Sequence, residues 1–298
     1  MLTPPNRRLG NKFLFIFSFF SIIFISKCLG QHQEREIFVY NISFAMVTSG
    51  IGAIINKPKN TNWKHAFVHG AWQGSVGGLL NYTAKKSLYF INKKQNDAYA
   101  FPAKILHAAG SSIIENAALY NKFLHNWTID YGPVRLDYSV GKKLRARFLP
   151  QSIYAIYYAS KYGKLNAAKS LISGVFVFET SNIFGQANSN GVSYGRAIGL
   201  DFNDPRFSNH KQLFAHELIH TFQYRDYQVL NTWLKPLEKK VKSKTLKTIF
   251  SKFIYFDVPW FWPFYELQGR YSSERYFKNF YEFEAQRFST NNIVHFRN

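Results

Sequence analysis

The stretch FAHELIHTFQYRD, residues 214–226, places two histidines four positions apart, with a glutamate directly after the first. Apolar residues recur around it at three- and four-residue steps: Leu213, Phe214, Leu218 and Phe222. This periodicity predicts an α-helix with one apolar face. Asn209 or Ser208 can cap its start, because their side-chain oxygens can accept a hydrogen bond from the first turn.

The spacing of the two histidines predicts a metal site. On a helix, residues i and i+4 lie one above the other, so His216 and His220 present two imidazoles to one point, as a zinc ion requires. Glu217 is turned aside by about 100° and can reach a water on the metal without sharing the metal itself. Zinc lowers the pKa of that water and the glutamate takes its proton. The alternative is an ordinary helix with two surface histidines and a solvated glutamate.

The chain begins like a secretory signal peptide. Arg7 and Arg8 precede an almost purely apolar run over residues 13–25, and small residues follow before Gln31. The run is shorter than the ~20 residues that a transmembrane helix needs. We therefore expect a signal peptide over 1–30 and export to the periplasm or cell envelope, with association with the membrane as an option. An uncleaved anchor is the alternative.

Cysteine content and charge limit the chemistry. Cys28 is the only cysteine and lies in the predicted leader, so the mature chain has neither disulfides nor thiolate ligands. The 298 residues contain 38 Lys+Arg against 17 Asp+Glu, a formal net charge of +21. In an exported protein this favours anionic lipid headgroups or envelope polymers over nucleic acid as partners. A compositional bias without function is the alternative.

Residues 31–127 are predicted to form a Gly/Ala-rich helical region. Helices are expected over 41–56, 66–80 and 103–127. The second of them carries glycines at four-residue spacing: Gly70, Gly74 and Gly78. A face without side chains lets another helix approach closely. We expect a tightly packed helical layer, and a re-entrant membrane hairpin is the alternative.

The composition changes near residue 128. Four segments rich in β-branched and aromatic residues read as strands: 128–139, 144–160, 173–180 and 195–202. With the histidine-bearing helix they predict an α+β catalytic region over 128–298.

Residues 236–253, PLEKKVKSKTLKTIFSKF, form a predicted basic amphipathic helix. Such a helix can lie on a membrane surface. A solvated face of the protein is the alternative.

A catalytic zinc normally has three protein ligands, so a third must come from elsewhere in the chain. The segment 280–289, read as the last helix, offers Glu282 and Glu284, which lie about 200° apart around it. Glu284 shares a face with three phenylalanines and would point inward, where an unpaired carboxylate is costly. Glu282 shares a small, polar face with Ala285 and Ser289, which leaves room for the active helix. Either glutamate can be the ligand on this reasoning.

These two segments resemble the gluzincin metallopeptidases, in particular the prenyl-protease/HtpX type and small stand-alone gluzincins. The matching residues are His216, Glu217, Leu218, His220, Gln223, and then Glu282, Phe283, Glu284 and Ala285. The family pattern in the second segment is Glu-x-x-Ala-Asp, and this chain has Gln286 in place of the aspartate.

The resemblance implies a zincin-like fold and one zinc ion held by His216, His220 and Glu282, with Glu284 as the alternative third ligand. It also implies Glu217 as the general base for attack of water on a peptide carbonyl. Three residues are candidates for stabilising the oxyanion: Arg275, Tyr276 and Tyr281.

Two functions follow from the sequence. The first is an exported zinc metallopeptidase that acts on a protein or peptide, with an anionic membrane surface as a further partner and no nucleic acid. The second is a non-catalytic binding protein of the cell envelope or membrane, in which the metal site is structural or degenerate.

Overall fold

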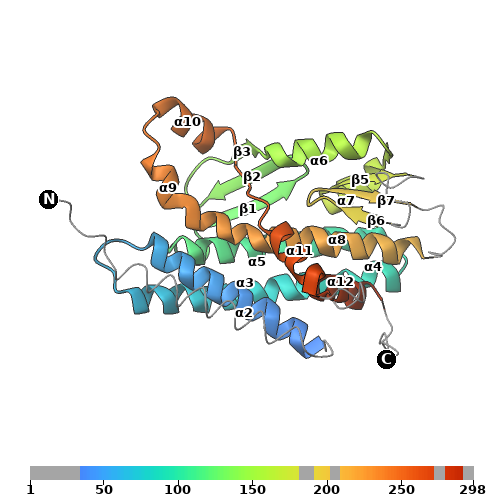
Figure 1. The fold of residues 1–298 in the computed structure, drawn as a ribbon, viewed down its shortest axis with the longest axis horizontal. Helices are drawn as coiled ribbons and strands as arrows, with labels where there is room; N and C mark the ends of the chain where they lie inside the picture. The colour runs from blue at the N-terminus through green and yellow to red at the C-terminus, as the bar shows by residue number, and fades with distance from the viewer. Residues whose placement is uncertain (1–33, 181–190, 202–208, 272–278, 291–298) are drawn as a thin grey trace.

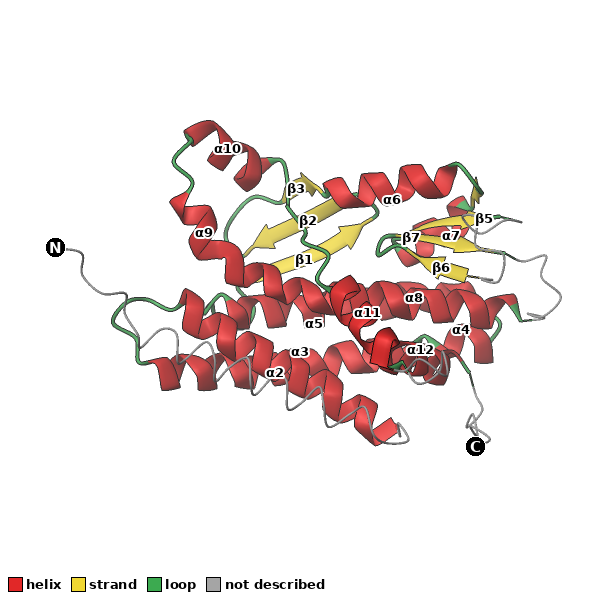
Figure 2. Ribbon diagram, viewed as in Figure 1, coloured by secondary structure: helices red, strands yellow, loops and turns green. Residues whose placement is uncertain are grey.

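The computed structural model describes residues 34–180, 191–201, 209–271 and 279–290. It mixes helices with two small sheets, which agrees with the α+β class expected from the sequence (Figure 1; Figure 2). The predicted leader over 1–30 lies outside the described residues.

The helices are α2 (Glu34–Asn56), α3 (Trp63–Ser87), α4 (Tyr89–Lys93), α5 (Ala100–Ala118), α6 (Pro150–Ser160), α7 (Ala167–Ser173), α8 (His210–Asp226), α9 (Lys235–Lys240), α10 (Lys244–Lys252), α11 (Phe261–Tyr271) and α12 (Phe280–Ser289). Two 3-10 helices join them, η1 (Asp97–Tyr99) and η2 (Tyr227–Leu234). The strands are β1 (Asn126–Tyr131), β2 (Val134–Ser139), β3 (Arg145–Phe148), β4 (Lys164–Leu165), β5 (Phe176–Glu179), β6 (Gly191–Ser193) and β7 (Ala197–Leu200).

Glycines on α3 allow the close helical packing that the sequence predicts. A Cβ atom added at Gly70 would lie 2.5 Å from the carbonyl oxygen of Ser49 on α2, and one added at Gly74 would lie 2.5 Å from that of Ala45. Gly77 meets α5 in the same way, because a Cβ there would lie 2.6 Å from the carbonyl oxygen of Gly110. The three helices therefore pack backbone to backbone.

Helix α2 is long and apolar enough to cross a membrane, judged by its length and composition alone. It is also largely covered by the protein, since 67% of its most apolar window is buried. These properties fit the core helix of a packed layer, and they also fit a segment of an N-terminal leader.

Helix α5 is shorter than expected. It ends at Ala118, and the segment that was predicted to continue it turns back to start β1 at Asn126. Tyr120, with φ of +57°, adopts the left-handed conformation just after the helix end. The Asn116 side chain then donates to the carbonyl oxygens of Phe123 and Asn126, which holds the turn against the helix.

The two sheets include three of the four predicted strand segments and the first part of the fourth, 144–160, as β3. The first has the order β1-β2-β3 and is antiparallel throughout. The second has the order β4-β5-β7-β6, with β5 and β7 parallel and β6 antiparallel to β7 at its end. The predicted strand over 128–139 is a hairpin of β1 and β2, while 173–180 and 195–202 contain β5 and β7.

The prediction of a strand over 144–160 is wrong beyond residue 148. Pro150 occupies the first turn of α6, where its fixed φ favours a helix and its missing N–H costs nothing. Ala155 and Ala159, four residues apart, are the buried face of this helix, whereas Tyr154 and Tyr157 are exposed. The aromatic and β-branched residues that suggested a strand belong to a helix, where Ile153, Tyr154 and Tyr157 are exposed and Ile156 and Tyr158 pack beside the two alanines.

Helix α8 lies in the middle of the molecule, with α2 and α3 on one side and the two sheets on the other (Figure 1). It continues directly into η2 and α9. One apolar core includes residues from α2, α5, β5, α8 and α12: Ile37, Ile114, Val177, Leu218 and Phe280. The predicted regions 31–127 and 128–298 thus share a single core.

Ion pairs join α8 to the first sheet. Asp130 of β1 is 1% exposed at its side chain and pairs with Arg225 of α8 at 3.1 Å and with Arg196 at 2.8 Å. Burial alone would raise the pKa of Asp130, but these guanidinium groups hold it far below its usual range. Arg225 also contacts Glu115 of α5 at 2.7 Å. Sheet, central helix and helical layer are therefore tied by buried charges.

We expect Gly74→Ala to destabilise the protein by ~1–3 kcal/mol, because its new methyl group would press on the backbone of α2. The gain in helix propensity from glycine to alanine, about 1 kcal/mol, does not offset a contact with a carbonyl that cannot move alone. Urea unfolding measures the change. Thr83→Ala, at an exposed position of the same helix, is the control. An unchanged or higher stability of Gly74→Ala would contradict the close packing.

Candidate metal centre

Helix α8 brings the two histidines together as the sequence predicts. Asn209 caps the helix, its side chain accepting a hydrogen bond from the backbone N–H of Gln212 at 3.1 Å, while Ser208 lies outside the described residues. The Nε2 atoms of His216 and His220 are 3.2 Å apart. Both imidazoles are buried, at 9% and 8% exposure of the residues.

Glu282 of α12 completes a group of three. Its Oε2 atom lies 3.3 Å from Nε2 of His216, and its Oε1 atom lies 3.4 Å from Nε2 of His220. Asn279 caps α12 by accepting from the backbone N–H of Tyr281, which places Glu282 in the first turn, where a helix favours negative charge. The group of His216, His220 and Glu282 could hold a metal ion.

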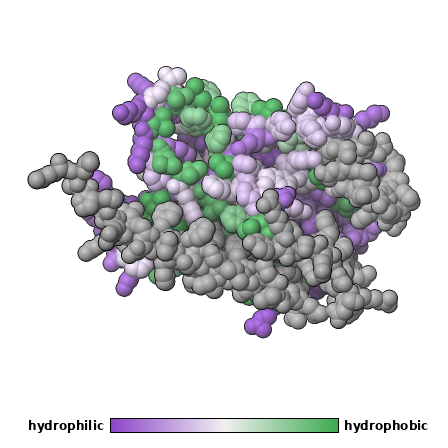
Figure 3. Space-filling view, in the orientation of Figure 1, coloured by the Kyte–Doolittle hydropathy of each residue, from purple (hydrophilic) through white to green (hydrophobic). Residues whose placement is uncertain are grey.

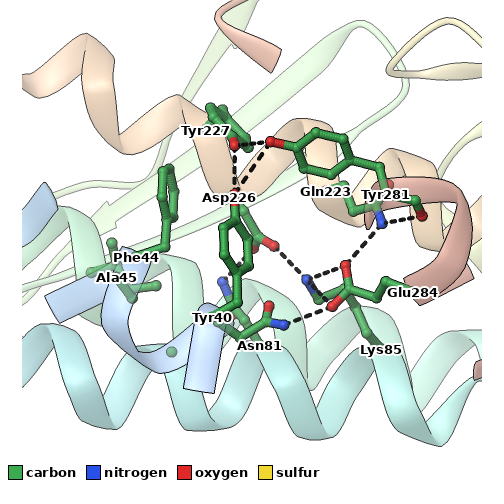
Figure 4. A pocket seen from close by; sticks show the side chains of 13 residues that line it. Tyr40, Phe44, Ala45, Asn81, Lys85, Gln223, Asp226, Tyr227, Tyr281 and Glu284 are labelled. Atoms are coloured by element: carbon green, nitrogen blue, oxygen red, sulfur yellow. Dashed lines mark hydrogen bonds and ion pairs between the residues drawn. The ribbon is translucent and has the colours of Figure 1, made fainter. Parts of the chain in front are cut away.

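Glu284, the alternative ligand, faces another part of the structure (Figure 4). Its carboxylate is fully buried and lies 3.0 Å from Nζ of Lys85 on α3. It also accepts hydrogen bonds from the side-chain amides of Asn41 at 2.6 Å and Gln223 at 2.8 Å. The sequence argument that Glu284 points inward therefore agrees with the structure, and its inward partners are a lysine and two amides rather than the histidines.

Gln223 links this carboxylate to the candidate metal centre. Its Nε2 atom donates to Glu284 and to the carbonyl oxygen of Tyr281, at 2.8 and 2.9 Å. The amide oxygen must then be the atom 2.8 Å from Nδ1 of His220. Because an amide oxygen only accepts, Nδ1 carries the hydrogen and Nε2 of His220 keeps its lone pair for the metal position.

Charge within the group favours a bound cation. Burial alone would lower the pKa of His220, but the adjacent Glu282 carboxylate outweighs burial and raises it to about 9. Burial alone would raise the pKa of Glu282, and the two imidazoles hold it well below its usual range. One carboxylate and two imidazoles at this separation therefore attract a positive charge, which a proton or a metal ion can supply.

Glu217 lies on the wall of a cleft beside this group. The cleft, of about 270 Å³, is also lined by His220, Glu282 and the segment Gly191–Gly195. A Cβ atom at Gly191 would lie 2.4 Å from Oε1 of Glu217, so only glycine lets β6 pass this close to the carboxylate. Burial raises the pKa of Glu217, against the opposing effect of the two histidines.

Tyr265 is a residue of this cleft that the sequence did not single out. Its hydroxyl donates to Oε1 of Glu282 at 2.6 Å, from the side of the cleft formed by α11. Two of the three residues that the sequence offers for stabilising the oxyanion, Arg275 and Tyr276, lie outside the described residues. The third, Tyr281, turns its hydroxyl to Tyr40 and Tyr227 in the interior (Figure 4).

A buried network continues from Glu284 to the end of α8. Lys85, which is 1% exposed, lies between Glu284 and Asp226, with Nζ 2.9 Å from Oδ2 of Asp226. Asp226 also contacts Nε2 of His107 at 3.0 Å and accepts from the amide of Asn81 at 2.8 Å. Helices α3 and α5 thus hold the C-terminal end of the histidine-bearing helix.

Comparison with known proteins identifies no family for this chain. No family model matches the chain, and neither the curated proteins nor the solved structures give a match. The resemblance to gluzincins stays a prediction that rests on the two sequence segments.

We expect Glu282→Ala to lose bound metal and Glu284→Gln to retain it with ~10-fold weaker affinity, the effect typical of changing the partner of a ligand. The reason is that Glu282 offers oxygen to both imidazoles, whereas Glu284 acts through Gln223. Elemental analysis after dialysis against metal buffers measures both, and urea unfolding checks that each variant is folded. If Glu284→Gln loses its metal while Glu282→Ala keeps it, the assignment is reversed.

Asp226 predicts a stability that depends on pH. Burial works against it, but Lys85 and His107 lower its pKa to about 2 from 3.8. Because the folded pKa is depressed, the stabilisation, about 2 kcal/mol, is complete above the unfolded pKa and is lost as pH falls from about 4 toward 2. Urea unfolding of wild type and Asp226→Asn between pH 6 and 3 should show a difference that shrinks as the pH falls. A difference independent of pH would contradict this role.

Proposed function

We propose that this chain is a zinc-dependent metallopeptidase, in which His216, His220 and Glu282 hold one zinc ion and Glu217 is the general base. The observation that carries the proposal is the geometry of the three ligand atoms next to the buried carboxylate of Glu217. The set of two imidazoles and one carboxylate is the donor set of several catalytic zinc sites.

The separations within the group support zinc in particular. Zinc binds nitrogen and oxygen ligands at about 2.0–2.2 Å in tetrahedral geometry, which separates the ligand atoms by about 3.3 Å. The two imidazole nitrogens here are 3.2 Å apart, a separation that suits two ligands of one zinc ion, and the two different oxygens of Glu282 lie 3.3 Å from the nitrogen of His216 and 3.4 Å from that of His220. Calcium and magnesium prefer six or more oxygen ligands, which this group does not offer.

The number of ligands supports a catalytic rather than a structural site. A structural zinc fills four positions with protein ligands, whereas a catalytic zinc keeps one position open. Among the residues that the structure describes, the group has three members, and a cleft opens beside it. When bound, zinc supplies a Lewis acid that lowers the pKa of water and polarises a carbonyl.

Glu217 is suited to hold and move the proton of that reaction. It lies in the same cleft wall as His220 and Glu282, next to the group but outside it. Its raised pKa brings it nearer to neutral pH, where a base both accepts a proton readily and returns it. We assign Glu217 two steps: it accepts a proton from the attacking water, and it then donates this proton to the leaving amine.

The cleft supports an extended peptide as substrate. Its far wall is the segment Gly191–Gly195, which includes β6 at the end of the second sheet, and its near wall is α8. Phe261, Trp262 and Tyr265 of α11 give it an aromatic side that suits apolar side chains of a substrate. The leader over 1–30 would place the enzyme in the periplasm or cell envelope, where its substrate is an envelope or imported protein.

We expect Glu217→Gln to keep its zinc and to lose hydrolysis by ~10²–10⁴-fold, because the amide cannot accept the proton. Peptidase activity on a mixture of denatured proteins, with zinc content measured on the same samples, tests this. Glu238→Gln is the matched control, since Glu238 is an exposed glutamate of α9 whose ion-pair partner is Lys235.

The second candidate function, a non-catalytic envelope protein, predicts a different pattern. If the metal site is structural, the wild type and Glu217→Gln would both contain zinc, and neither would hydrolyse peptides faster than His216→Ala. Near wild-type turnover of Glu217→Gln would also contradict the proposal, because another residue would then be the general base.

A further inference from the structure

Helix α10 presents its apolar residues to the outside. Leu246 is 45% exposed and Phe253, at the end of the helix, is 59% exposed, and no residue of α10 is buried. Ile249 lies on the same face, since positions three and seven residues apart share one side of a helix. Figure 3 shows this part of the molecule as a green, hydrophobic surface. A helix of a protein core would turn this face inward.

The polar side of α10 faces the protein instead. A cleft of about 660 Å³ separates the helix from β2, β3 and α5. Four polar residues of α10 line it: Lys244, Lys247, Thr248 and Ser251. Phe250, which is 40% exposed, also lines the cleft. The polar residues of α10 thus face the cleft, whereas a helix packed on a core turns its polar residues to solvent.

The cleft carries uncompensated positive charge. Arg135 and Arg147 are paired with Asp137, and Lys235 is paired with Glu238. In the described part of the chain, three further cations of the lining have no ion pair: Arg145, Lys244 and Lys247. The wall behind α10 is thus basic.

Exposed aromatic residues continue the apolar face beyond the helix. The backbone N–H of Phe148, at the end of β3, donates to the carbonyl oxygen of Phe253 at 2.7 Å. Phe148 is 56% exposed and Phe256 is 60% exposed. We call Leu246, Ile249, Phe253, Phe148 and Phe256 the α10 face.

We propose that the α10 face docks on a membrane that contains anionic phospholipids. Its apolar residues would enter the boundary between headgroups and acyl chains, as amphipathic helices of this composition do. Lys252 lies about 120° from Leu246 on the helix, and Lys247, which lines the cleft, lies about 100° to the other side. Both lysines are exposed, so their long side chains can extend their ammonium groups to lipid phosphates. Lys244 and Arg145 add positive potential behind them.

The charge distinguishes this partner from a second copy of the chain. Two basic faces of the same protein repel each other, and the chain as a whole has a formal net charge of +21. An anionic surface instead gains attraction from each lysine that approaches it. The inference does not depend on the proposed peptidase activity, because no residue of the metal group takes part.

The experiment reads the position of α10 directly, so that an apolar leader cannot mimic the result. In the full chain with Cys28→Ser, Leu246→Cys is labelled with an environment-sensitive fluorophore. Tyr154→Cys, labelled in the same way, is the control, because Tyr154 is 70% exposed on α6. Both proteins are mixed with phosphatidylcholine vesicles, with or without phosphatidylglycerol, that carry a quencher on the acyl chains.

The label at position 246 should shift to the blue and be quenched with the anionic vesicles, while the label at 154 should not respond. Replacing both Lys247 and Lys252 by Gln should raise the lipid concentration needed for half of the response ~30-fold, because each lysine near an anionic surface contributes about 1 kcal/mol. Equal responses at 246 and 154, no response at 246, or no dependence on phosphatidylglycerol would each overturn the proposal. So would a response at 246 without vesicles at high protein concentration, because a second copy would then cover the face.

Discussion

The structure depends on burying α8 on all sides although many of its residues are polar. Every residue from Leu213 to Arg225 is buried. Burying an unpaired charge costs several kcal/mol, so several charged and polar side chains of this helix have partners on elements packed against it. The partners come from every direction, and they fix which elements can surround the helix and in what rotation.

The partners define the layers of the fold. Glu282 and Glu284 bring α12 to one side of α8, through the two histidines and Gln223. Arg225 fixes α5 and β1, and Asp226 fixes α3 through Lys85. A sheet on one side and a helical layer on the other follow from these contacts, and the apolar core fills the space between them.

The sequence predicted the features that depend on local spacing. The helix of His216 and His220, the close packing at the glycines of α3 and three of the strand segments follow from periodicity along one element. The sequence did not predict which residues from distant parts of the chain pair with one another. Lys85 and Lys86 look alike in the sequence, yet a turn of about 100° between neighbours buries the first and exposes the second. Tyr265 had no feature to separate it from the other aromatic residues of its segment. The strand expected over 144–160 is present only up to Phe148, because Pro150 begins a helix that the aromatic and β-branched composition of the segment does not indicate.

The same network explains why the N-terminal helical region belongs to the metal centre. Lys85 neutralises Glu284, and Glu284 holds the amide of Gln223 (Figure 4). This amide fixes the hydrogen on Nδ1 of His220. A buried Glu284 without Lys85 would carry an uncompensated charge, which is costly in the interior of a protein. The orientation of His220 in the candidate metal centre is therefore supported by a lysine that precedes it by more than a hundred residues and lies on another helix. Helices α2 and α3, which supply Asn41 and Lys85 to Glu284, are thus part of the support of this site.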